Sequence, residues 1–545
     1  MSWQNLKLSL LWGNDVDNDE GSRKVDRRKS PCSLTVLSPT HDRSNLGGID
    51  RKGRQSLMLN RQIVLLLLLI ILPATTAQPG PQKRLNVLFI AVDDLRPEFG
   101  AYGSTQIHSP NLDRLARSGM TFDRAYCQQA VCSPSRSSLL TGARPDTTRV
   151  WDLVTHFRTA MPDVVTLPQH FKDNGYFVQG MGKLYHGGYN DPQSWSVPWG
   201  TPKTVTYALP ENQERLKNSQ QLRRQGASEE GARGPAFEAA DVPDNTFQDG
   251  AVADLAVSTL RDLSKRDQPF WLGVGFIKPH LPFVAPKKYW DLYDPKKIAL
   301  ASNPFRAKDS PEFAVLPGGE LRNYRDIPQG PIPDDLARQL KHGYYAAISY
   351  TDAQIGRLLD ELDRLQLREK TIIVLWGDHG WKLGEHGAWC KHSNVENDTH
   401  APLIISAPGM KTSGKHSSSL VEFVDIYPTL AELAGLSLPA HLEGVSLVPV
   451  LRDPKRSVKT AAFSQYPRQN KGERLMGYSM RTDRYRFTRW MLRSDLTKVV
   501  AVELYDHRSD PQENTNIASD PKNGTLVATL TAQFEKGWRG AKGVK

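Results

Sequence analysis

Two short apolar runs, each followed directly by acidic residues, most strongly constrain how this 545-residue chain can fold. The first ends at Asp93 and Asp94, and the second begins at Thr371 and ends at Asp378 and His379. A continuous apolar run of this length is typical of a strand buried on both faces of a parallel sheet. Ligands of such sheets bind outside the carboxyl ends of the strands. We therefore expect these polar side chains to gather at one edge of the sheet.

The remaining pattern predicts helices around that sheet and a smaller second unit. Between the two runs, residues 333–365 carry apolar side chains at spacings of three and four, which indicates an amphipathic helix. Strands that alternate with helices favour a doubly wound α/β fold. The polar stretch 206–235 is interpreted as a surface insertion near the entrance to the site, and the short β-prone pieces after Arg456 predict a small antiparallel subdomain closed by a helix.

The N-terminal region predicts export. Residues 63–72 are all apolar and are followed by small residues up to Ala77. A membrane span needs about 20 apolar residues, so this run reads as a signal-peptide core that is cleaved after Ala77. Since Met58 stands where such a peptide should start, we interpret 1–57 as a non-native or disordered leader and 58–77 as the signal peptide. An uncleaved anchor is the alternative; after cleavage no membrane span is expected.

The net charge indicates which class of partner the protein binds, and the positions of the cysteines limit which of them can form a disulfide. A net charge of +11 suits an anionic partner, and no nucleic-acid-binding signature accompanies it, so a polyanionic sugar is expected rather than nucleic acid. Of the four cysteines, Cys32 would leave with the leader. Cys127 and Cys390 would then either form a disulfide or remain two separate buried thiols.

The fourth cysteine lies in a segment with its own signature. Cys132-Ser-Pro-Ser-Arg136 reads as a loop entering a helix that ends at Gly142, with Cys132 beside the positive helix N-terminus, where an anion is favoured. From these residues alone, Cys132 could be a thiolate nucleophile or, more commonly, a buried structural cysteine.

Cys-x-Pro-Ser-Arg followed by Leu-Thr-Gly resembles the hallmark of the type I sulfatases. Within that family the chain is similar to the iduronate-2-sulfatase branch from about residue 86 to 520, through segments that recur in the same order: 86–97, 128–132, 182–186, 278–283, 378–387 and 478–482. The resemblance implies the alkaline-phosphatase-like α/β fold, with a central, mostly parallel sheet flanked by helices. It also implies a catalytic domain over 83–455 and a smaller α+β subdomain with an antiparallel sheet over 456–545.

The same resemblance implies a modified residue and a metal. In the family, a formylglycine-generating enzyme oxidises the cysteine that matches Cys132 to formylglycine. One calcium ion would then be held by the following residues: Asp93, Asp94, Asp378, His379 and the modified Cys132. Clustered carboxylate oxygens suit such a hard cation. His379 is the unusual ligand, because most sulfatases place Asn there, whereas the iduronate-2-sulfatase branch has His.

The activity implied is hydrolysis of a sulfate ester on a sulfated carbohydrate. One hydroxyl of the hydrated aldehyde attacks sulfur to give a covalent sulfo-enzyme, and the second allows sulfate to be eliminated. Arg136, Lys183 and Lys391 match cations that hold the sulfate. His280 matches the general acid and His186 the general base. Four further residues of the matched segment are expected either to support the ligands from behind or to form pocket walls: Trp381, Glu385, His386 and Trp389.

Two other functions remain open at this point. A phosphonate or phosphodiester hydrolase on the same fold would use the same groups, and a non-catalytic sulfated-glycan-binding protein would keep the basic cleft with Cys132 unmodified. We expect the bacterial periplasm or secretion, or the lysosome in a eukaryote. Exo and endo action are not distinguished.

Overall fold

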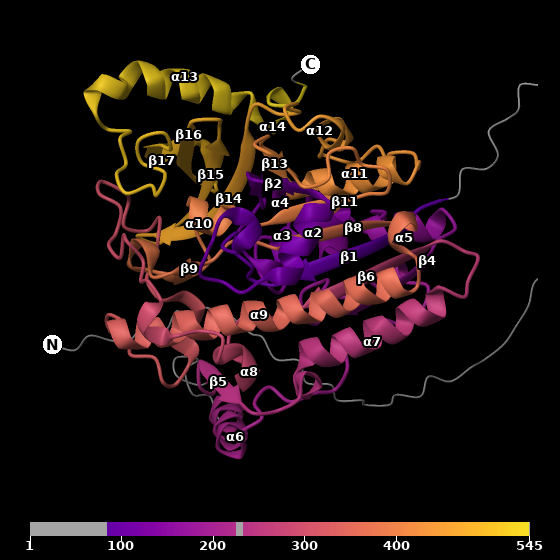
Figure 1. Cartoon of the computed structure of the whole chain (residues 1–545). Helices are drawn as coiled ribbons and strands as arrows, with labels where there is room; N and C mark the ends of the chain where they lie inside the picture. The colour runs from indigo at the N-terminus through magenta and orange to yellow at the C-terminus, as the bar shows by residue number, and fades with distance from the viewer. Residues whose placement is uncertain (1–83, 225–232, 544–545) are drawn as a thin grey trace, which may run out of the picture. The chain divides into compact units, whose positions relative to one another are not determined.

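The computed structural model describes residues 84–224 and 233–543, which lie within one compact unit (Figure 1). Cys32, Met58 and the expected signal peptide lie outside the described residues. Over the described part of the chain, no helix combines the length and the apolar character that a membrane crossing requires.

A seven-stranded sheet forms the centre of this unit. β1 and β8 are adjacent and parallel, and their register pairs Val92 with Gly377. Asp93 and Asp378 therefore leave the same edge of the sheet, as the two apolar runs predicted. In spatial order the strands are β12 (Lys415–Ser417), β2 (Met120–Phe122), β11 (Leu403–Ser406), β8 (Thr371–Gly377), β1 (Asn86–Val92), β6 (Phe270–Phe276) and β4 (Phe177–Gly182). The sheet is mostly parallel, but β11 runs antiparallel to both of its neighbours.

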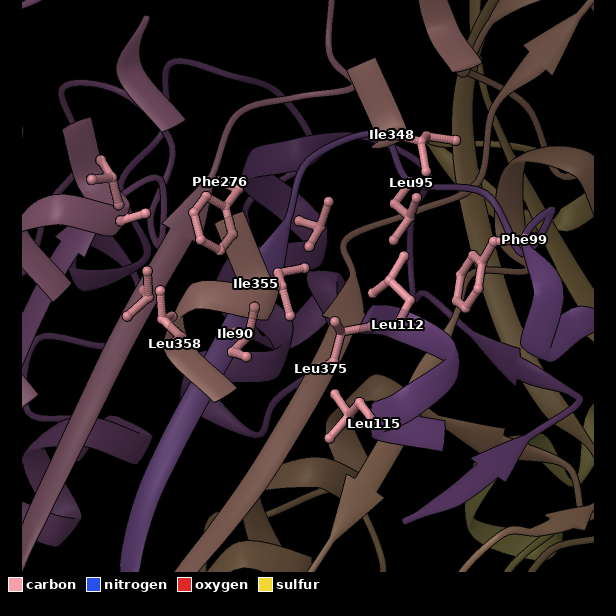
Figure 2. Close-up of a cluster of buried hydrophobic side chains, with 14 of the residues drawn as sticks. Ile90, Leu95, Phe99, Leu112, Leu115, Phe276, Ile348, Ile355, Leu358 and Leu375 are labelled. Carbon is pink, nitrogen blue, oxygen red and sulfur yellow. The ribbon is translucent and has the colours of Figure 1, made fainter. Parts of the chain in front are cut away.

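Helices cover both faces of the sheet. Successive residues of a strand point to opposite faces, so each central strand contributes side chains to both layers. Leu88 and Ile90 pack into one core cluster, and Val87 and Phe89 pack into the other. Figure 2 shows Ile90 and Leu375 of the sheet beside Ile355 and Leu358 of the long helix. The first face is covered by α2 (Pro110–Ser118), α7 (Gln248–Leu263) and α9 (Asp334–Arg364); the second is covered by α3 (Cys132–Thr141), α5 (Leu167–Asp173) and α11 (Ile426–Leu433).

The C-terminal part forms a second, four-stranded sheet, which confirms the predicted antiparallel sheet and its final helix. Its strands follow one another in space as in sequence: β14 (Ala462–Asn470), β15 (Glu473–Arg481), β16 (Tyr485–Leu492) and β17 (Asp495–Asp506). The helix α13 (Gly524–Glu535) packs on this sheet through a small core that includes Phe487 and Leu530. The domain boundary at 455/456 stays a prediction.

Shorter elements complete the described chain: α4 (Pro145–Thr148), α6 (Pro210–Arg224), β5 (Phe237–Ala240) with β7 (Phe283–Pro286), α8 (Lys287–Trp290), β9 (Lys382–Leu383) with β10 (Trp389–Cys390), α10 (Glu396–Thr399), β3 (Ala125–Tyr126) with β13 (Val421–Glu422), α12 (Val448–Arg452) and α14 (Gly537–Gly540). The stretch interpreted as an insertion thus contains a helix, α6, which the polar composition did not indicate. Cys127 and Cys390 are separate buried thiols, so the disulfide alternative is not realised in this structure.

Candidate active site and metal centre

The acidic residues at the carboxyl ends of β1 and β8 form the floor of the site. Asp93, Asp94, Asp378 and His379 are all fully buried. Asp94 adopts a left-handed backbone conformation with φ of 58°, which costs energy for a residue with a side chain. In this conformation the Asp94 N–H donates to Oδ1 of Asp378 at 3.0 Å. The two strand ends are therefore tied together directly.

Cys132 enters this cluster from the first residue of α3. Its side chain is only 2% exposed, and its Sγ lies 3.4 Å from Nε2 of His379. The hydroxyl of Ser135, one turn along α3, donates to the carbonyl of Asp378 and fixes the helix against β8. Burial, and then the negative charge of Asp93, raise the pKa of the Cys132 thiol well above its usual range. The unmodified thiol therefore stays protonated at neutral pH, which argues against the alternative of a thiolate nucleophile.

Arg136, the residue after Ser135 in α3, binds two of the carboxylates. Its Nη2 lies 3.0 Å from Oδ1 of Asp93, and its Nε lies 2.9 Å from Oδ2 of Asp378. Its Nη1 donates to the carbonyls of Lys183 and Leu184. A guanidinium has five N–H groups, so only one is left for a substrate. The contacts of this buried side chain thus support the positioning of Asp93 and Asp378 more directly than the sulfate contact expected from the sequence.

The two lysines also face carboxylates. Lys183 forms an ion pair with Asp93. The buried Nζ of Lys391 lies 3.0 Å from Oδ1 of Asp94 and 3.0 Å from Oε2 of Glu320. These carboxylates raise the pKa of Lys391 well above its usual value in spite of burial, so the ammonium stays charged.

The two histidines expected to carry protons are neutral in the substrate-free protein. Burial lowers the pKa of His186 to about 3, and the positive charge of Lys183 acts in the same direction. Burial likewise lowers the pKa of His280 to about 3, although Glu320, whose Oε1 lies 3.4 Å from its Nε2, opposes the shift. The Nδ1 of His280 can only donate to its partner, the carbonyl of Leu281, so Nε2 is the atom that would take up and release a proton.

The ring of His379 is oriented as a metal ligand would be. Its Nδ1 lies 2.9 Å from the carbonyl of Gly380 and must donate to it. Burial lowers the pKa of His379, so the ring is neutral and its Nε2 carries a lone pair. Nε2 lies 3.4 Å from Oδ1 of Asp94 and 3.6 Å from Oδ1 of Asp378. Each of these carboxylate oxygens already accepts one hydrogen bond, Oδ1 of Asp378 from the Asp94 N–H and Oδ1 of Asp94 from Lys391. Their remaining lone pairs, together with that of Nε2, suit a bound cation.

Spacing and charge fit a calcium ion as well. One ligand atom each from Asp93, Cys132, Asp378 and His379 lie within 4.8 Å of one another, which suits ligands about 2.4 Å from a common centre. Among the described residues of the cluster, three carboxylates face three cations, while Glu320 is further paired with Arg233 at 2.9 Å. These charges balance, so a divalent cation would make the site net positive toward an anionic substrate.

The structure thus brings the residues named from the sequence into one buried cluster, and it adds two that sequence reasoning missed. Glu320 lies in the short 3-10 helix η6 (Gly319–Asn323), and nothing in the neighbouring sequence signalled a role. Asp249 of α7 accepts from the backbone N–H groups of Ile277 and Lys278 at 2.8 Å each and so fixes the segment that carries His280.

Of the expected pocket-wall residues, Trp381 lies under Lys391, whose Nζ is 4.8 Å from the ring centroid. Glu385 pairs with Arg96 at 2.8 Å. His386 and Trp389 are buried.

Comparison with known proteins identifies the family. The model of the sulfatase family matches residues 85–436, and that of the C-terminal region of N-sulphoglucosamine sulphohydrolase matches residues 384–539. The chain belongs to the sulfatase family. As a sulfatase it is a sulfuric ester hydrolase, and the resemblance noted from the sequence is confirmed.

Relatives and solved structures agree with this assignment. The sulfatase is 36% identical to human iduronate 2-sulfatase over 555 residues, covering 88% of this chain and 99% of that protein. A solved structure bound to its substrate D-glucosamine-2-N,6-O-disulfate has a TM-score of 0.65 at 22% identity and covers 84% of this chain and 98% of its own. A phosphonate monoester hydrolase from Silicibacter pomeroyi has a TM-score of 0.64 at 23% identity, covering 83% and 95%. Both structures confirm the predicted fold.

Proposed function

We propose that this sulfatase hydrolyses a sulfate ester on a sulfated carbohydrate, as an exported enzyme of iduronate-2-sulfatase type. The observation that carries the proposal is Cys132, which lies 3.4 Å from His379 at the centre of a buried cluster of carboxylates and cations. The substrate class is supported by 36% identity to human iduronate 2-sulfatase across nearly the whole of that protein. Export would bring the enzyme to a bacterial periplasm, to the cell exterior or, in a eukaryote, to a lysosome.

The reactive group in this proposal is formylglycine, made from Cys132 by a formylglycine-generating enzyme. The hydrated aldehyde supplies two hydroxyls, one to attack sulfur and one whose deprotonation expels sulfate from the enzyme. Asp93, Asp94, Asp378, His379 and the modified residue would hold a calcium ion, whose positive charge would favour the deprotonated nucleophile and offset charge on the sulfate.

The other side chains have roles that follow from their charge. Lys183 and Lys391 remain ammonium groups and attract the sulfate oxygens. His186, neutral because burial depresses its pKa, can accept the proton of the second hydroxyl. His280 takes up a proton at Nε2 beside Glu320 and donates it to the departing sugar oxygen. Arg136 acts as a positioning residue through Asp93 and Asp378, with at most one N–H left for the sulfate.

Substituting Cys132 by Ala tests the proposal directly. With the wild-type protein co-expressed with a formylglycine-generating enzyme, we expect turnover of a sulfated uronic acid or amino sugar. The Cys132→Ala variant should fold normally and lose at least about four orders of magnitude in kcat, because the nucleophile is gone. Substantial remaining activity in this variant would refute the assignment of Cys132.

The same assay separates the rival activities. A phosphonate monoester hydrolase has the same fold, and its reaction centre is also tetrahedral, so a phosphonate monoester must be assayed beside the sulfate ester. Faster turnover of the phosphonate would replace the proposal with that rival. Binding of sulfated sugars without any turnover, by protein whose Cys132 stays a thiol, would favour a non-catalytic glycan-binding protein.

A further inference from the structure

Two exposed arginines that are far apart in the sequence share one indole ring beside the active site. The guanidinium carbon of Arg493 lies 4.5 Å from the ring centroid of Trp151, and that of Arg149 lies 5.7 Å from it. Arg149 follows α4 in a left-handed conformation with φ of 59°, and Arg493 directly follows β16. Neither guanidinium forms an ion pair with a carboxylate anywhere in residues 84–224 or 233–543. We call this group the arginine pair.

A partly buried scaffold beneath the arginine pair holds it in place. Asp146 accepts hydrogen bonds from Nε1 of Trp151 at 3.1 Å, from Nε2 of Gln465 at 2.9 Å and from the hydroxyl of Tyr478 at 2.8 Å. These bonds join α4 to the first two strands of the C-terminal sheet. Because they occupy the Asp146 carboxylate, it orients the indole and does not cap either guanidinium. The cations therefore keep their outward-facing donors for a ligand.

The arginine pair adjoins the catalytic cluster along two paths. Gln129 donates from Nε2 to the carbonyl of Trp151 at 2.8 Å, and it precedes Cys132 by only three residues, or at most roughly 11 Å between Cα atoms. On the other side, the loop that follows Trp151 carries His156, whose ring centroid lies 6.2 Å from that of Tyr189. Tyr189 in turn lies 6.3 Å from the ring of His186. These contacts connect Trp151 and the loop that follows it to the segments that carry Cys132 and His186.

We propose that Arg149 and Arg493, held by Trp151, form a subsite for a second anionic group of the substrate. That group is a sulfate or carboxylate on the sugar next to the one that carries the scissile ester. The guanidinium fork matches the oxygen geometry of both anions, and two guanidiniums preorganised on one indole lose little freedom on binding. The inference rests on the proposed function, and it makes this enzyme selective for substrates of at least two sugars.

The test compares two disaccharides that carry the same scissile sulfate, one with and one without an anionic group on the neighbouring sugar. The measured quantity is the ratio of their kcat/KM values in wild type, Arg149→Gln, Arg493→Gln and the double variant. Arg266→Gln is the matched control, because Arg266 is also an exposed arginine over an aromatic ring, 4.2 Å from the centroid of Phe177. Phe177 is the first residue of β4 and so lies at the amino end of that strand, whereas the site lies at the carboxyl ends of the strands.

We expect each single substitution to lower the ratio by about fivefold and the double variant by roughly twentyfold, with no change in the control. Added salt should lower the ratio in wild type and leave the double variant unaffected. A ratio that is unchanged in the double variant, while wild type turns over both disaccharides, would overturn the subsite and leave the proposed function intact.

Calorimetric binding of both disaccharides to Cys132→Ala protein gives a readout that does not need turnover. The doubly anionic disaccharide should bind more tightly than the other, and only while Arg149 and Arg493 are present. If the doubly anionic disaccharide binds equally well with and without the two arginines, the subsite is refuted. This result does not depend on turnover, so it can be distinguished from a failure of the proposed function.

Discussion

His280→Gln tests whether a protonated histidine assists the leaving group. Burial lowers the pKa of His280 to about 3 in the substrate-free protein. Each pH unit above that value reduces the imidazolium fraction tenfold, so at pH 5 about one molecule in a hundred holds the proton. Since kcat/KM reports the free enzyme, it should fall about tenfold per pH unit above roughly pH 4. Because a general acid must be protonated to act, kcat/KM should be highest at acidic pH and should fall as the pH rises.

The assay measures kcat/KM between pH 4 and 8 on a sulfated sugar and on an aryl sulfate, whose phenolate can leave without a proton. In His280→Gln we expect a loss of about 100- to 10,000-fold on the sugar ester, a much smaller loss on the aryl ester, and disappearance of the alkaline slope. His108→Gln is the control, since His108 is exposed and its ring packs on Tyr293. Equal losses on both esters, or a slope that persists in the variant, would refute the role of His280.

Three further substitutions test the cluster around it. Asp378→Asn should raise the calcium concentration needed for half-maximal activity and for thermal stabilisation by about tenfold or more, whereas an unchanged calcium dependence would remove Asp378 from the metal site. Arg136→Met leaves the Asp93 and Asp378 carboxylates buried without their guanidinium. Chemical denaturation should show a free energy of unfolding about 3–5 kcal/mol lower than that of wild type in the presence of a chelator, and a smaller decrease in the presence of calcium. Equal decreases under both conditions would contradict the metal site. Glu320→Gln removes the carboxylate beside His280, so the alkaline limb of kcat/KM should move to lower pH, and an unmoved limb would exclude that influence.

The sequence predicted the elements whose side chains repeat with a clear period. β1 and β8 are uninterrupted apolar runs, and α9 carries an apolar stripe at spacings of three and four. The spacing of the apolar residues was therefore sufficient to predict these three elements. The antiparallel direction of β11 was not predicted, because Leu403–Ser406 is as apolar as a parallel strand would be and direction depends on its connections. The helix α6 was missed because its residues are mostly polar and form no apolar stripe.

The candidate site was predictable to the extent that its residues sit at strand ends or in recognisable segments. Asp93 and Asp378 could be brought together by the rule for parallel sheets, and Cys132 by its segment. Glu320 could not, since it reaches Lys391 and His280 from the short 3-10 helix η6, whose position depends on tertiary packing. The arginine pair was equally hidden, because a contact between residues separated by more than 300 positions leaves no periodic signal.

The central claim is that Cys132 becomes an aldehyde, and the mass of one peptide tests it most directly. Trypsin should release residues 125–136 from denatured protein that was co-expressed with a formylglycine-generating enzyme, and this peptide also contains Cys127 as an internal thiol control. We expect a peptide in which Cys127 is alkylated and the sulfur of Cys132 has been replaced by an aldehyde oxygen. Two alkylated cysteines in that peptide, with another sulfatase fully converted in parallel, would contradict it.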